Sequence, residues 1–207
     1  MGRTSGGVTR EKGSGLKPGD ILSTTSLISE REHYQQEVDD TLTVLRDIYN
    51  EYGVTIDTEV AELKPGTGTM GYYDGKNIAI SREYFNSDEM NRAYAEGVKS
   101  GWHPSNGNKS GMEAVVAHEY GHALTDKVGQ AMGVSGIDNI ASRIVKEARK
   151  ETKSKGVVQM ASKISRYATT SNAEAIAEAF SDFYCNGSKA KKESLAIINV
   201  MNKYLKK

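Results

Sequence analysis

The sequence predicts an α+β fold in which a small sheet, antiparallel or mixed, packs with a cluster of helices. Three observations support this prediction. Apolar residues recur at helical spacing through most of the second half of the chain. Short stretches between residues 54 and 81 change to the pattern typical of strands. The chain has 207 residues, 37% of them hydrophobic, which suits one domain with an extension.

The N-terminal part of the chain lacks any hydrophobic periodicity. Residues 1–29 are rich in Gly, Ser, Thr and Lys, so we expect a flexible leader or linker, or the stub of a larger polypeptide. The folded domain is then expected to cover residues 30–207. Its first predicted helix spans residues 30–52, where apolar residues fall at helical spacing and Gly53 provides a stop.

The sheet is predicted from three short segments. Residues 54–60 alternate between apolar and polar side chains, as a half-buried strand does. Residues 70–73 and 77–81 flank the turn sequence Asp-Gly-Lys at 74–76, which is typical of a β-hairpin. Residues 97–111 are rich in Gly and should be irregular. Further helices are predicted at 112–128, 137–148, 157–164, 172–184 and 189–205.

Charge and composition exclude several classes of function. The 27 basic and 27 acidic side chains balance, so we expect no nucleic-acid or membrane-surface partner. No apolar run reaches the ~18–20 residues of a membrane span, and residues 1–20 lack the apolar run of a secretory signal. The single cysteine, Cys185, excludes an internal disulfide. A cytoplasmic, a virion-associated and a non-classically exported protein all fit, and the oligomeric state stays open.

The residues that indicate chemistry form the run His118-Glu119-Tyr120-Gly121-His122. On a helix, positions i and i+4 share one face, so both imidazoles can face one metal ion. Glu119 can then reach a water molecule on that ion. This is the HExxH pattern of zinc peptidases, and it predicts Zn²⁺ as the cofactor. The alternative is a pair of helix-face histidines without a metal.

A catalytic zinc site needs a third protein ligand and one open position. The longer pattern HExxHxxGxxH is absent, because Thr125 and Val128 stand at its last two positions. The remaining histidines, His33 and His103, have no metal-ligand spacing, so a carboxylate is expected. Three acids four residues apart share one face of the helix predicted at 172–184: Glu174, Glu178 and Asp182.

The spacing of Tyr167, Glu174 and Glu178 after a HExxH helix resembles the catalytic domain of anthrax lethal factor and the Pro-Pro endopeptidases. The run Ala173–Phe180 is similar to the ligand helix of that family, and the order of elements agrees over residues 54–207. The resemblance implies a zincin-like, gluzincin-type domain with residues in the following roles. Zinc would be bound by His118, His122 and Glu174, with Glu119 as general base, Tyr167 facing the substrate carbonyl, and Glu178 supporting a ligating histidine.

A second register is also open. Glu178 followed by Ser181-Asp182 is similar to the thermolysin-type pattern, which would make Glu178 the ligand and Asp182 its support. The placement of Tyr167 favours Glu174, and so does Ala177, where the thermolysin pattern has Asn. By the same resemblance, residues 77–81 would form the edge strand that aligns a substrate.

The expected function is that of a zinc-dependent metalloendopeptidase acting on a protein or peptide substrate. The alternative is a non-catalytic zinc-binding structural or assembly module, because related segments occur in phage head proteins. An intact Glu119 favours the enzyme, since a purely structural zinc site needs no general base.

Overall fold

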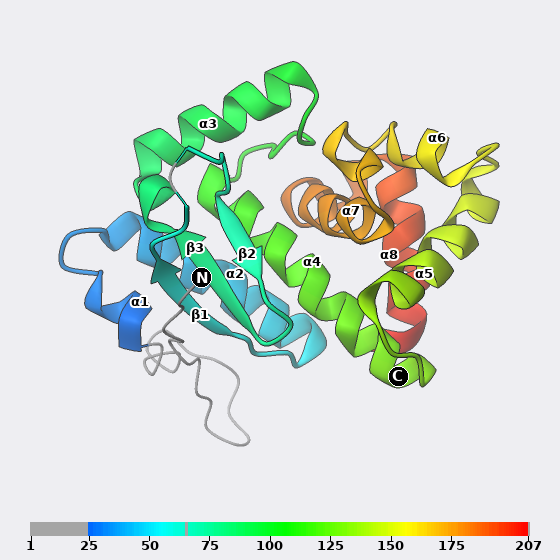
Figure 1. Ribbon diagram of the computed structural model, residues 1–207, viewed down its shortest axis with the longest axis horizontal. Helices are drawn as coiled ribbons and strands as arrows, with labels where there is room; N and C mark the ends of the chain where they lie inside the picture. The colour runs from blue at the N-terminus through cyan, green and yellow to red at the C-terminus, as the bar shows by residue number, and fades with distance from the viewer. Residues whose placement is uncertain (1–24, 65, 207) are drawn as a thin grey trace.

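The computed structural model describes residues 25–64 and 66–206 and shows an α+β protein. Within these residues the chain forms eight α-helices, three short 3₁₀ helices and three strands (Figure 1). Residues 1–24 of the predicted leader lie outside the described part. Residues 25–29 of that leader are described: they form the helix α1 (Thr25–Ser29), in which Leu27 is fully buried.

The three strands form one mixed sheet in the order β1-β3-β2. The hairpin prediction is confirmed, because β2 (Gly71–Tyr73) pairs antiparallel with β3 (Asn77–Ser81). Its turn is stabilised by Asp74, whose Oδ1 accepts hydrogen bonds from two backbone N–H groups of the turn, 2.8 and 2.6 Å away. β1 (Asp57–Ala61) pairs in parallel with β3, so the sheet is mixed rather than antiparallel throughout.

The prediction of β3 as an edge strand is wrong, because β3 lies between the other two strands. All five of its residues are buried, and the run Ile78–Ile80 has no exposed surface. A continuous apolar run is typical of a strand covered on both faces. Within the described sheet, β2 is the edge strand beside the predicted metal helix.

Two helices flank the sheet in the sequence, one before β1 and one after β3. α2 (Gln35–Tyr52) begins five residues later than predicted and ends as predicted at Gly53, which has a left-handed φ of 64°. α3 (Ser87–Ser100) was not predicted, because it buries only Met90 and Tyr94 and therefore shows a sparse apolar stripe. The 3₁₀ helix η1 (Arg82–Tyr84) joins β3 to this region.

The predicted metal helix is α4 (Gly111–Met132), which forms the centre of the molecule. Its first turn carries a capping box: Ser110 accepts a hydrogen bond from the Glu113 N–H, and the Glu113 carboxylate accepts one from the Ser110 N–H. The helix ends at Gly133, whose left-handed conformation suits glycine.

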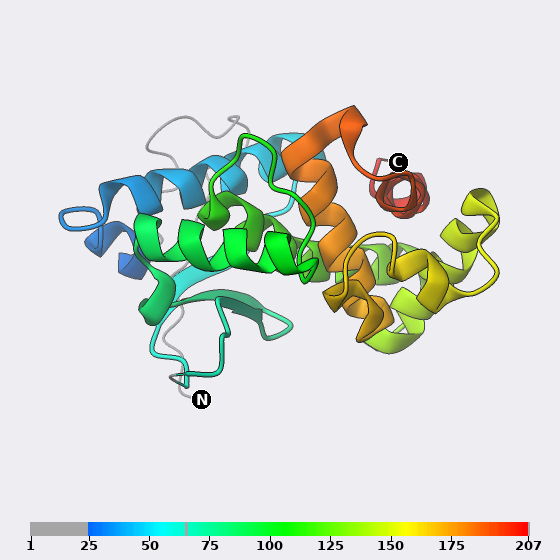
Figure 2. The same cartoon turned by 90° about the horizontal axis from the view of Figure 1, so that it is seen from above.

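The remaining helices are α5 (Ile137–Thr152), α6 (Val157–Ala161), α7 (Asn172–Asn186) and α8 (Lys192–Leu205), with the 3₁₀ helices η2 (Tyr167–Thr169) and η3 (Gly187–Lys189). In Figures 1 and 2, α1–α3 and the sheet lie on one side of α4, and α5–α8 lie on the other. α4 packs most extensively on α7. No helix in the described residues combines the length and apolar character needed to span a bilayer.

Candidate metal centre

Three sequence-predicted side chains converge between α4 and α7. One nitrogen each from His118 and His122 and one oxygen from Glu174 lie within 4.8 Å of one another. Glu174 Oε2 is 3.1 Å from His118 Nε2 and 3.5 Å from His122 Nε2. The histidines share a helix face because they are four residues apart. Glu174 lies in the first turn of α7, where Ser171 caps the helix by accepting a hydrogen bond from the Glu174 N–H at 3.0 Å.

The donor set fits a cation. Glu174 Oε2 is buried, and no hydrogen-bond donor in the described residues reaches it with good geometry, although two imidazole nitrogens face it. Burial would raise the pKa of the Glu174 carboxyl, but the two histidines outweigh it and hold the pKa well below its usual range. Two imidazole nitrogens and one carboxylate oxygen are a common ligand set of catalytic zinc.

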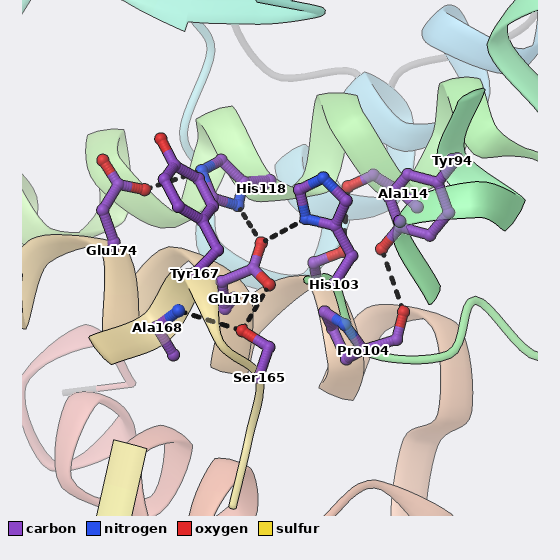
Figure 3. A network of polar contacts seen from close by, with 12 residues as sticks. Tyr94, His103, Pro104, Ala114, His118, Ser165, Tyr167, Ala168, Glu174 and Glu178 are labelled. Carbon is purple, nitrogen blue, oxygen red and sulfur yellow. Dashed lines mark hydrogen bonds and ion pairs between the residues drawn. The ribbon is translucent and has the colours of Figure 1, made fainter. Parts of the chain in front are cut away.

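Glu178 contacts the other nitrogen of the first histidine. Its Oε1 lies 2.9 Å from His118 Nδ1 (Figure 3). A carboxylate only accepts hydrogen bonds, so Nδ1 carries a proton, and Nε2 is the His118 nitrogen that faces Glu174. Glu178 is only 1% exposed. Burial would raise its pKa, but hydrogen bonds from His103 and His118 lower it to about 2.

The thermolysin-type register does not agree with this geometry. Asp182 lies away from the histidines and joins α7 to α8: its Oδ2 accepts hydrogen bonds from the Lys191 N–H at 2.8 Å and the Ser194 hydroxyl at 2.6 Å. Glu178 faces Nδ1 of His118 rather than the side where Glu174 and His122 meet. Among the described residues, the group that could hold a metal ion contains Glu174 and not Glu178.

The side chain of Glu119 extends from α4 toward the edge strand β2. It is 5% exposed, and burial raises the pKa of its carboxyl. A Cβ atom on Gly71 would be 2.9 Å from Glu119 Oε1 and 3.0 Å from Cγ, which is too close for a real contact. With a larger residue at position 71, the Glu119 carboxylate or β2 would have to shift.

Tyr167 lies across the site from β2, at the start of η2. Its ring stacks on the His118 ring with centroids 5.7 Å apart and an interplanar angle of 12°. The Trp102 ring also stacks on the Tyr167 ring, with centroids 5.2 Å apart. Burial raises the pKa of the Tyr167 phenol above its usual value, so the hydroxyl stays protonated and is available as a hydrogen-bond donor.

Two cavities meet at these residues. One has a volume of about 230 Å³ and extends toward Trp102 and Tyr94. The other, of about 610 Å³, extends along β2 toward His122 and Asp126. Both are lined by Gly71, Thr69, His118, Glu119 and Tyr167. Two exposed aromatic side chains lie at the cleft: Tyr72 is 46% and Trp102 38% exposed.

Sequence reasoning missed two residues of the site. His103 Nδ1 lies 3.2 Å from Glu178 Oε1, and the Ser165 hydroxyl donates to Glu178 Oε2 at 2.7 Å (Figure 3). Neither has a spacing that marks it, because both reach Glu178 through the tertiary fold. The Gly-rich composition around His103 was the one available signal.

Comparison of the chain with protein-family models, with curated proteins and with solved structures finds no match. The function is therefore inferred from the residues of the site.

Proposed function

We propose that this protein is a zinc-dependent metalloendopeptidase with a zincin-like cleft. The observation that carries the proposal is the convergence of donor atoms from His118, His122 and Glu174 beside a separate buried carboxylate, Glu119. The donor set would hold zinc, and Glu119 remains free for proton transfer. A structural zinc site, in contrast, is usually closed by a fourth protein ligand.

The chain's own residues would divide the chemistry as follows. Bound zinc supplies Lewis-acid polarisation of a carbonyl group and lowers the pKa of a water molecule toward ~7. Glu119 accepts the proton of the attacking water and passes it to the leaving amine.

Tyr167 would stabilise the charge that develops on the carbonyl oxygen. It faces both cavities, its ring is held against His118, and its hydroxyl is protonated. A single positioned donor of this kind contributes roughly 10²–10³ in rate. Glu178 orients His118 by accepting its Nδ1–H, so that Nε2 points toward the ion.

A polypeptide substrate is favoured by the edge strand. Among the described residues, β2 is an edge strand of the sheet, paired with β3, and it borders the larger of the two cavities. An extended peptide can add to such an edge through backbone hydrogen bonds. The exposed rings of Tyr72 and Trp102 offer apolar contacts at the cleft.

The test has two stages. Protein purified without chelator should contain about one zinc per chain, as expected for one three-ligand site. The zinc-loaded protein should cleave members of a diverse peptide library that includes Pro-rich and basic sequences, and a chelator should abolish cleavage. The Glu119→Gln variant should keep its zinc and lose cleavage. Absence of bound metal after incubation with zinc would refute the proposal, and bound zinc without any cleavage would favour the structural or assembly module.

A further inference from the structure

We propose that His103 is a positioning residue of this site, which orients His118 through the Glu178 carboxylate that both histidines share. The inference rests on the proposed zinc site and goes beyond it, because His103 is neither a ligand nor part of the HExxH motif. The observation behind it is that two imidazole Nδ1 atoms, at 2.9 and 3.2 Å, contact the same oxygen of one buried carboxylate.

The hydrogen bonds of Glu178 can be fully assigned. Oε1 accepts from His118 and His103, so each imidazole carries its proton on Nδ1. Oε2 accepts from the Ser165 hydroxyl at 2.7 Å, because the Ser165 oxygen itself accepts the Ala168 N–H at 2.9 Å. Three donors thus fix the carboxylate plane. Removing the His103 donor would leave Oε1 with His118 alone and free the carboxylate to tilt.

His103 is itself held rigidly. Its ring stacks on Tyr94 with centroids 5.0 Å apart and an interplanar angle of 7°, and Tyr94 is 3% exposed. The Tyr94 hydroxyl donates to the Pro104 carbonyl, the residue after His103. A Cβ on Gly97 would lie 2.5 Å from His103 Cδ2, so the glycine provides the space that the ring occupies.

The same segment also holds Tyr167. The Arg166 N–H donates to the Gly101 carbonyl at 2.8 Å, and the Tyr167 N–H donates to the Trp102 carbonyl at 3.1 Å. The His103 ring meets the Tyr167 ring edge-on at 5.8 Å. The loop that carries His103 therefore contacts the site in two places, at Glu178 and at Tyr167. Hydrogen-bond partners of metal-ligating histidines typically change metal affinity by ~10–100-fold when removed.

Two variants of the full-length chain separate the hydrogen bond from packing. His103→Phe keeps a ring to stack on Tyr94 and removes the N–H donor. His103→Asn keeps a donor at the position of Nδ1 and loses the ring. We expect His103→Phe to weaken zinc affinity ~10–100-fold. We expect His103→Asn to stay within about threefold of the wild type, well below that range. The measurement is zinc competition against a chromogenic chelator. His33→Phe, at an exposed histidine, is the matched control and should change nothing.

The outcomes are distinct from those of the proposed function. If the wild type binds zinc and His103→Phe binds it equally well, the inference is overturned and the zinc site stands. If His103→Asn loses as much affinity as His103→Phe, ring packing rather than the hydrogen bond is responsible, and the inference also fails. If the wild type binds no zinc, the proposed function itself fails.

A measurement on the wild type keeps the test valid even if His103→Phe does not fold. Two-bond ¹H–¹⁵N correlation spectra of the imidazoles report which ring nitrogen carries the proton. We expect the Nδ1–H form for both His103 and His118 in the zinc-loaded protein. An Nε2–H form at His103 would contradict the shared carboxylate.

Discussion

The close approach of α4 and α7 at Gly121 makes the geometry of the site testable by one methyl group. A Cβ at this position would lie 2.7 Å from Ala177 Cα, about 0.7 Å short of the 3.4 Å of ordinary contact. The obstacle is backbone, which cannot rotate away, so Gly121→Ala should push the helices apart. Overpacking of this kind costs about 1–3 kcal/mol, while the better helix propensity of alanine returns up to ~1 kcal/mol.

The displacement would act directly on the candidate ligands. Gly121 precedes His122 in α4, and Ala177 lies between Glu174 and Glu178 in α7. We therefore expect Gly121→Ala to lower the melting temperature by several degrees, since ~1 kcal/mol corresponds to about 2–4 °C at this chain length. We also expect it to weaken zinc binding.

Gly129→Ala is the matched control for this experiment. Its Cβ would lie 2.2 Å from the Cδ1 atom of Ile140, the end of a flexible side chain between α4 and α5. This variant can lose stability but should keep wild-type zinc affinity. The reasoning is refuted if Gly121→Ala binds zinc as tightly as Gly129→Ala does, whatever their melting temperatures.

Three further predictions concern single side chains. Glu174→Ala should lose zinc, whereas Glu178→Ala should retain it with ~10–100-fold lower affinity; chelator competition distinguishes the two, and the reverse order would move the ligand to Glu178. Tyr167→Phe should lower turnover by roughly 10²–10³ with zinc content unchanged, so an unaltered rate would remove Tyr167 from the reaction. Ser110→Ala should cost about 0.5–2 kcal/mol of stability through the lost cap of α4, as measured by denaturant unfolding; a smaller loss would show that the capping box contributes little.

Local patterns in the sequence predicted the elements that carry their own signals. The β2–β3 hairpin follows from the Asp-Gly-Lys turn, and β3 has the predicted limits Asn77 and Ser81. α4 and α7 were predicted to within a few residues from their apolar spacing. The grouping of His118, His122 and Glu174 was also predicted, because helix periodicity fixes two of the positions and the resemblance indicated the third.

What the sequence could not predict depends on contacts between distant segments. The parallel pairing of β1 with β3 brings together strands separated by β2, and no turn sequence encodes it. α3 was missed because Met90 and Tyr94 are its only buried residues. The role of His103 depends on a contact 75 positions along the chain, at Glu178. Nothing in its neighbours identifies that partner.

The central helix would also limit how the cleft could adapt to the proposed peptide substrate. α4 is a continuous helix of 22 residues, about 33 Å long at 1.5 Å per residue. Both sides of the cleft are fixed to it, β2 through Glu119 and Val115 and η2 through its packing on α7. Hinge bending between the two sides would require bending this helix. The width of the cleft is therefore set during folding, and adjustment to the proposed substrates would fall to side-chain rotations at the exposed Tyr72 and Trp102.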